Sequence, residues 1–252
     1  MEEQGPQVVS RVGALLRTLG ECEPDGASTT VIARLSGLAR PTVHRLLTSL
    51  VGEGLAERSS ETGRWFLGPE LYLLGTMAAE RYDVTDLARQ TVALLAKETG
   101  ESAFFSARRG DQTVCLLRED GSFPLRSHVL YEGIRLPLGV ASAGLVILAH
   151  RSDREIDGFF ERVDLTTAWG VSHSESAVRG RIAETRTTGF AVNPGLLVEG
   201  SWGIGAAVFD RHGSPEWALS LTGVESRFRP DRLPGLGARL LDQAHALSRL
   251  LA

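Results

Sequence analysis

The spacing of apolar residues predicts three short helices near the start of the chain. In each segment the apolar positions recur every three or four residues, which places them on one face of a helix. Gly20, Gly37 and Gly52 follow the segments, as is typical of helix ends. Ser28 can cap the second helix, and Pro41 fits the first turn of the third. The predicted helices cover residues 8–19, 29–36 and 40–51.

Two short segments after the third helix predict a β-hairpin. They cover residues 55–58 and 64–67, and the polar turn 59–63 between them ends in glycine. Short helices with a turn before the last of them and a hairpin behind it are typical of a winged helix-turn-helix. A further helix begins at Pro69 and is expected to run to about Arg81.

From about Asp83 the pattern changes to a mixture of helices and short strands. Glycine turns at Gly110 and Gly213 indicate antiparallel hairpins, which favour an α+β domain over a doubly wound parallel sheet. The fold class expected for the whole chain is therefore α/β in the broad sense, of the α+β type. Strands are predicted at residues 103–108, 113–118, 125–129, 191–197, 202–209 and 217–223, and helices at 84–99, 142–150, 153–160, 175–187 and 233–251.

Length and composition fit two domains without a membrane segment. The chain has 252 residues, of which 42% are hydrophobic and 23% charged, and ~100–200 residues per domain is usual. No apolar run approaches the ~18 residues that a membrane helix needs, and the acidic start lacks the apolar region of a signal peptide. We expect a cytoplasmic protein with domains at 1–68 and 84–252, joined by a linker helix at 69–83.

The sequence contains no motif for catalysis, a metal or a cofactor. Cys22 and Cys115 are isolated, and the histidines show no paired spacing. Residues 140–144 lack the first glycine of GxSxG, and no P-loop, GxGxxG or HExxH segment occurs. We therefore expect no catalytic residues, no metal site and no cofactor. Cys115 lies in an apolar run and is expected to be a buried strand residue.

Positive charge gathers around the third predicted helix, although the net charge of the chain is −4. Residues 28–66 contain five arginines and three glutamates. An isolated helix of this kind would be a solvated surface helix, but the turn before it and the hairpin after it favour a recognition helix in the major groove of DNA. The arginines of the hairpin are placed for phosphate or the minor groove. The residues expected to bind DNA are Thr29, Arg40, Thr42, His44, Arg45, Arg58 and Arg64.

Short segments along the chain resemble those of the IclR (isocitrate lyase regulator) family. The resemblance covers essentially the whole chain. Pro41 stands where a small hydroxyl residue is common in the family, and Gly139 and Leu145 replace a frequent histidine and a frequent lysine. The matching segments are LSGLARPTVHRLL at 35–47, ETGR at 61–64, LG at 67–68, LP at 136–137, ASAG at 141–144, LA at 148–149, TGFA at 188–191, VFD at 208–210 and LSLTG at 219–223.

The resemblance implies a transcription regulator with an N-terminal winged helix-turn-helix and a C-terminal GAF-like effector-binding domain. It implies a homodimer or tetramer, which would read an inverted-repeat operator in double-stranded DNA, because one recognition helix contacts too few bases for specificity. A repressor of a catabolic or metabolic operon is expected, controlled by a small organic effector such as an organic or aromatic acid. On matching positions, the effector pocket involves Ser142, Ala143, Asn193, Ser201, Gly203, Ser220 and Thr222.

Strand alternation supports such a pocket independently. In the segment 217–223, Ser220 and Thr222 share one face, and in the strand before it Gly203 and Gly205 form a face of small residues. Two such faces leave both space and polar anchors for a ligand. The alternative is that the small residues only let a helix pack closely and that the hydroxyls bond to backbone.

Two other functions stay open at this point. One is a winged-helix regulator of another family, such as a GntR-like protein, and the other is a sensor domain that acts through protein partners. Sequence-specific binding to a DNA duplex separates both kinds of regulator from the sensor.

Overall fold

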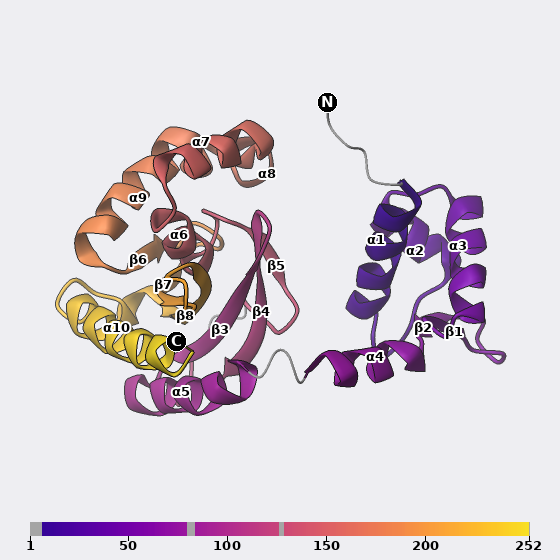
Figure 1. Ribbon diagram of the computed structural model, residues 1–252, viewed down its shortest axis with the longest axis horizontal. Helices are drawn as coiled ribbons and strands as arrows, with labels where there is room; N and C mark the ends of the chain where they lie inside the picture. The colour runs from indigo at the N-terminus through magenta and orange to yellow at the C-terminus, as the bar shows by residue number, and fades with distance from the viewer. Residues whose placement is uncertain (1–6, 80–83, 126–128, 252) are drawn as a thin grey trace. The chain divides into compact units, whose positions relative to one another are not determined.

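The computed structural model describes residues 7–79, 84–125 and 129–251, and the chain divides into two compact units, Met1–Tyr82 and Asp83–Ala252 (Figure 1). A helix, α4 (Pro69–Ala79), covers most of the segment 69–83 for which a linker helix is expected, and it belongs to the first unit. Residues 80–83, the rest of that prediction, lie outside the described residues.

The first unit has the predicted order of three helices and a hairpin. Its core is built from buried side chains of all three helices together with Trp65 of the hairpin. Ser28 caps the second helix by accepting a hydrogen bond from the Val31 amide at 3.3 Å, and Gly37 ends it with φ of 69°. The elements are α1 (Gln7–Glu21), α2 (Thr29–Ser36), α3 (Arg40–Gly52), β1 (Ala56–Arg58) and β2 (Trp65–Leu67). The winged helix-turn-helix is therefore confirmed.

The second unit is built on one antiparallel sheet of six strands in the order β5-β4-β3-β8-β7-β6. Each predicted strand from 103 onward is present with shifted ends, except the one at 125–129. The strands are β3 (Ser102–Arg109), β4 (Gln112–Glu119), β5 (Arg135–Pro137), β6 (Ala191–Pro194), β7 (Ser201–Phe209) and β8 (Pro215–Val224). This antiparallel sheet confirms the α+β type and excludes a doubly wound arrangement.

Helices cover both faces of this sheet, so that the unit has two apolar cores (Figure 1). Alternation along β8 places Leu219 and Leu221 in one core and Ala218 in the other. The first core is closed by α5 (Val84–Thr99) and α10 (Leu233–Leu250). The second is closed by α6 (Ser142–Ala149), α7 (Asp153–Arg162), α8 (Leu165–Trp169) and α9 (Glu175–Thr188).

The predicted strand at 125–129 is wrong. Leu125 is 64% exposed and, like Val129, lies in a bend, while residues 126–128 lie outside the described residues. The strand that pairs with β4 at this edge is β5, whose Leu136 is buried and lies opposite Thr113. A segment becomes a strand only where a neighbouring strand pairs with its backbone, and here β4 pairs with the later segment.

The Cys115 thiol lies in the interior of the second unit, in a strand as the sequence predicts. Cys115 is 3% exposed in β4, which confirms the prediction of a buried strand residue. Burial, with a smaller contribution from Glu132, raises the pKa of the Cys115 thiol to about 12, so that it stays protonated and unreactive.

None of the helices in the described part of the chain has the length and hydropathy needed to cross a membrane.

We expect residues 84–252 to fold alone, with the domain boundary near Asp83. The reason is that α10 buries Leu236, Leu240 and Leu247 against the sheet of its own unit, which gives this part a complete core. Thermal unfolding of the expressed fragment should be cooperative. An insoluble fragment, or one that loses structure gradually on heating, contradicts a separate C-terminal domain.

Candidate functional site

One side of α3 is buried and the other carries basic side chains. Val43 and Leu47 are fully buried, whereas Arg40, His44 and Arg45 are exposed and Thr42 is half-buried. The hydroxyls of the next turn are used within the helix, since Thr48 and Ser49 donate to the carbonyl oxygens four residues earlier, at 2.8 and 3.1 Å. The free polar surface of α3 is therefore its first two turns, as a recognition helix requires.

Trp65 connects the predicted DNA-binding residues to one another. Its side chain is 2% exposed, and its Nε1 donates to Thr29 Oγ1 at 2.9 Å. The His44 ring meets the Trp65 ring edge-on at 5.9 Å, and the Arg58 guanidinium lies 5.2 Å from its centroid. The sequence analysis missed this role, and the signal for it was a tryptophan beside Arg64 in a wing strand. Trp65 holds α2, α3 and the wing in one arrangement.

Arg64 makes a hydrogen bond within the protein. Its Nη1 donates to the Asp25 carbonyl oxygen at 2.9 Å, which ties β2 to the loop before α2. The guanidinium stays exposed and has further N–H donors, so that a phosphate contact is compatible with this bond. Arg58 donates from Nε to the Gly63 carbonyl oxygen at 3.4 Å, across the wing turn.

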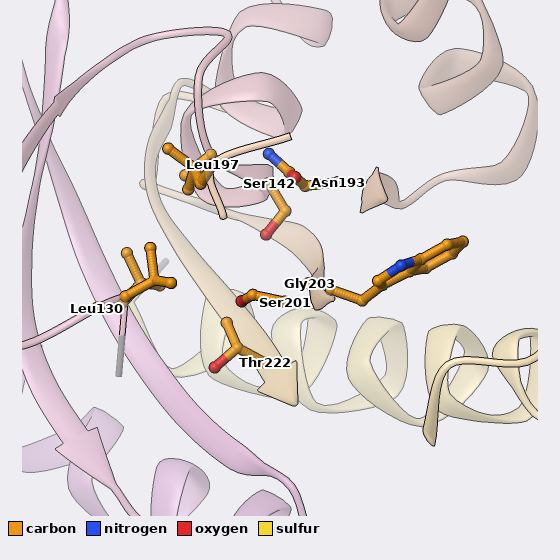
Figure 2. Close-up of a pocket in the computed structure, with 10 residues that line it drawn as sticks. Leu130, Ser142, Asn193, Leu197, Ser201, Gly203 and Thr222 are labelled. Atoms are coloured by element: carbon orange, nitrogen blue, oxygen red, sulfur yellow. The ribbon is translucent and has the colours of Figure 1, made fainter. Parts of the chain in front are cut away.

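A small cavity lies between the first turn of α6 and strands β7 and β8, and Figure 2 shows the hydroxyl side chains of Ser142, Ser201 and Thr222 around it. Five of the seven expected effector-binding residues line this cavity. They are Ser142, Asn193, Ser201, Gly203 and Thr222. The other lining residues, which the sequence analysis missed, are Val129, Leu130, Ala141, Leu197 and Trp202.

Ala143 and Ser220 are buried but do not line the cavity. A Cβ added at Gly205, which pairs with Ser220 across the sheet, would lie 2.7 Å from the Ser142 carbonyl oxygen. The first turn of α6 therefore sits directly on the sheet at this point. At Gly205 the small residue serves close helix packing, which is the alternative that the sequence left open.

The polar groups of the cavity differ in whether they already have hydrogen-bond partners within the protein. Asn193 is satisfied, because Nδ2 donates to the Val140 carbonyl oxygen at 2.7 Å and Oδ1 accepts from the Leu196 amide at 3.0 Å. Thr222 Oγ1 is buried and has no hydrogen-bond partner in the described part of the chain. The N-cap of α6 is Ala141, which offers its first turn no side-chain acceptor.

This chemistry suits a ligand with a polar, electron-rich head. Amide groups at a helix N-terminus attract a carboxylate or another oxyanion, and Thr222 lines the same cavity. No charged residue lines the cavity in the ranges that the structure describes. Its volume is ≈ 20 Å³, close to the space that one water molecule needs. Within the same ranges, no cluster of three or more His, Cys, Asp or Glu could hold a metal ion.

A winged helix-turn-helix joined to a sheet domain with a small polar pocket defines a DNA-binding regulator. Two family models match the chain, the IclR helix-turn-helix domain at residues 8–60 and the bacterial transcriptional regulator IclR C-terminal domain at 76–249. The chain belongs to the IclR family of transcriptional regulators. Members of this family are regulators rather than enzymes, which agrees with the absence of catalytic motifs from the sequence.

Two relatives span nearly all of the chain. The glycerol operon regulatory protein of Streptomyces griseus is 30% identical over 249 residues, which cover 96% of this chain and 95% of the relative. The transcriptional repressor IclR of Escherichia coli is 25% identical over 242 residues, covering 94% of this chain and 87% of that protein.

Solved structures share the fold. An IclR transcriptional regulator from Alicyclobacillus acidocaldarius aligns with a TM-score of 0.81 at 22% identity, covering 98% of this chain and all of the other. An IclR homolog from Microbacterium hydrocarbonoxydans, crystallised with 4-hydroxybenzoate, aligns with a TM-score of 0.75 at 21% identity, covering 97% and 98% of the two chains.

Proposed function

We propose that this regulator binds an inverted-repeat operator as a homodimer or tetramer and that a small organic acid in the α6 pocket changes its affinity for DNA. The observation that carries the proposal is a cavity lined by Thr222, whose buried hydroxyl lacks a partner in the described part of the chain, and by the first turn of α6, which has no side-chain cap. Because DNA is the proposed partner, the protein would act in the cytoplasm.

The relatives support the direction of regulation and the class of ligand. The Escherichia coli relative is named a repressor, and the Streptomyces griseus relative is named for the glycerol operon. The Microbacterium hydrocarbonoxydans homolog was crystallised with an aromatic acid. We therefore propose repression of a catabolic or metabolic operon, released or strengthened by an organic acid.

The size of the cavity supports a link between ligand binding and a change of shape. A volume of ≈ 20 Å³ is smaller than an organic acid, so the ligand must displace side chains that close the space. Leu130 and Leu197 stand opposite the hydroxyls in Figure 2 and are the apolar groups that would move. A ligand that favours the opened state shifts the protein toward it, and this shift is coupled reciprocally to DNA affinity.

The test combines a ligand screen with operator titration. Thermal unfolding of the full chain is measured with a panel of carboxylic acids that includes 4-hydroxybenzoate. Each acid that raises the midpoint is then added to a titration of the operator. A panel that changes neither the unfolding midpoint nor the operator affinity contradicts control by an organic acid.

Arg64→Ala should weaken binding to the operator and to a scrambled duplex by similar factors. Arg64 is exposed in the wing, and a contact to phosphate contributes to all sequences alike. The slope of log affinity against log salt concentration should become shallower by about one, because about one counterion fewer is released on binding. Thermal unfolding of the variant reports separately on the lost bond to Asp25. If Arg64→Ala loses affinity for the operator but not for the scrambled duplex, Arg64 contacts a base edge rather than phosphate.

A further inference from the structure

The second unit contains a larger cavity at the other end of α6. Its volume is ≈ 550 Å³, within the ~300–1,000 Å³ that is usual for small-ligand sites. Leu148 in the last turn of α6 lines this cavity, whereas Ser142 in the first turn lines the small pocket. Since a helix rises by about 1.5 Å per residue, the two spaces lie well apart.

Four arginines line the large cavity and come from three parts of the chain. Arg108 stands near the end of β3, Arg151 follows α6, and Arg154 and Arg162 belong to α7. Arginine presents a planar group with five N–H donors, which matches the oxygens of a carboxylate or phosphate. A concentration of this residue type around one space indicates an anion site.

Two of the arginines share a single carboxylate. Glu216 Oε1 accepts from Arg108 Nη1 at 3.3 Å and from Arg151 Nη2 at 2.9 Å. Arg151 also donates to Glu155 Oε1 at 3.2 Å. The Nε–H groups of Arg108 and Arg151 are buried without a hydrogen-bond partner in the described ranges. Carboxylates therefore hold both guanidiniums, and the N–H groups that stay unpartnered are buried rather than offered to a ligand.

The remaining pair of arginines differs in its partners. Arg162 donates twice to the Asp111 carboxylate, each time at 2.9 Å. Arg154 is exposed and makes no hydrogen bond or ion pair with any described residue. Four arginines and the three carboxylates that pair with them leave one positive charge at the cavity, and Arg154 is the side chain that carries it.

The floor of the cavity is apolar. Leu138, Leu148 and Phe159 line it, and each is at most 2% exposed. We propose that this cavity is a second ligand site, which binds a small organic monocarboxylate through Arg154. One unpaired positive charge matches one carboxylate, whereas the second charge of a phosphate monoester would lie near Glu155 without a partner.

The test measures binding to the full chain in a form whose small pocket is filled. Titration calorimetry of the Gly203→Leu variant uses benzoate and hexanoate as probes, with benzamide and phenyl phosphate as the neutral and doubly charged comparisons. Both acids should bind at one site per chain, and the two comparison compounds should bind at least about 10-fold more weakly. Absence of binding by both acids, or tighter binding of phenyl phosphate, overturns the proposal.

Two variants locate the binding in this cavity. Arg154→Gln should raise the Kd of benzoate roughly 10-fold, because it removes a charged donor without breaking an ion pair. Arg229→Gln, at an exposed arginine elsewhere in the unit, should leave it unchanged. Gly158→Leu fills the cavity from α7, where a new Cβ meets only Arg162 Nη1 at 3.2 Å, and should abolish binding. Unchanged affinity in both cavity variants overturns the site.

Discussion

Gly203→Leu should abolish the response of operator binding to an organic-acid effector while leaving operator binding itself intact. A Cβ at Gly203 meets Ser142 Oγ, Thr222 Cγ2 and a backbone oxygen at the ordinary contact distance of 3.4 Å, so the first side-chain carbon fits, and thermal unfolding checks that the variant accommodates the rest. The rest of the leucine side chain then occupies the small cavity that Gly203 lines. The measurement is an operator titration with and without the acid that the thermal screen selects.

Thr222→Val tests the same pocket, because it should raise the stability of the ligand-free protein and weaken the response to the effector. Valine nearly conserves the volume and removes a buried hydroxyl that has no partner in the described part of the chain. Since burying such a group costs about 1–3 kcal/mol, the ligand-free variant should gain stability of this order at most. The effector loses a hydrogen bond of similar size and should act at roughly 5- to 150-fold higher concentration.

Ser220→Ala is the matched control for Thr222→Val. Ser220 Oγ is also buried without a partner in the described ranges, but Ser220 does not line the cavity. The control should gain stability and keep the wild-type effector response. If Thr222→Val and Gly203→Leu both respond like wild type, the effector binds elsewhere. A response lost equally in Ser220→Ala contradicts the assignment of the hydroxyl to the ligand.

Elements with many apolar repeats could be predicted closely from the sequence. The helix Val84–Thr99 has the predicted bounds, because four turns of regular spacing lie between a clear start and Gly100. The five-residue helix Leu165–Trp169 was not predicted, since it is too short to show a period. The edge strand Arg135–Pro137 was missed for the same reason, and the segment at 125–129 was predicted as a strand in its place.

The pocket could be predicted in part, from the alternation of residues along β7 and β8. Alternation tells which side chains share a face, and Gly203 and Thr222 indeed line one space. It does not tell where a helix touches that face. Ser220 shares the face with Thr222, but the first turn of α6 covers the sheet there, and only packing in three dimensions reveals this. Leu130 and Leu197 reach the cavity from loops, where no period exists.

Arg45→Ala should weaken binding to the operator by about 1–3 kcal/mol, which is roughly 5- to 150-fold, and should narrow the difference between operator and scrambled duplexes. Arg45 is exposed in the second turn of α3, beside His44, and its guanidinium makes no hydrogen bond or ion pair with any described residue. Bidentate contact of such a group with a guanine edge is the most common specific contact in the major groove.

Arg17→Ala provides the control for Arg45→Ala, because it removes the same charge from an exposed position of α1. A loss caused only by net charge weakens both variants alike on both duplexes, and it fades as the salt concentration rises. If Arg45 instead contacts a base, Arg45→Ala should bind the operator more weakly than Arg17→Ala, and the two variants should bind the scrambled duplex with similar affinity. Gel-shift titrations on both duplexes at two salt concentrations make this comparison. If Arg45→Ala binds the operator as tightly as wild type, the exposed side of α3 is not the surface that reads the bases.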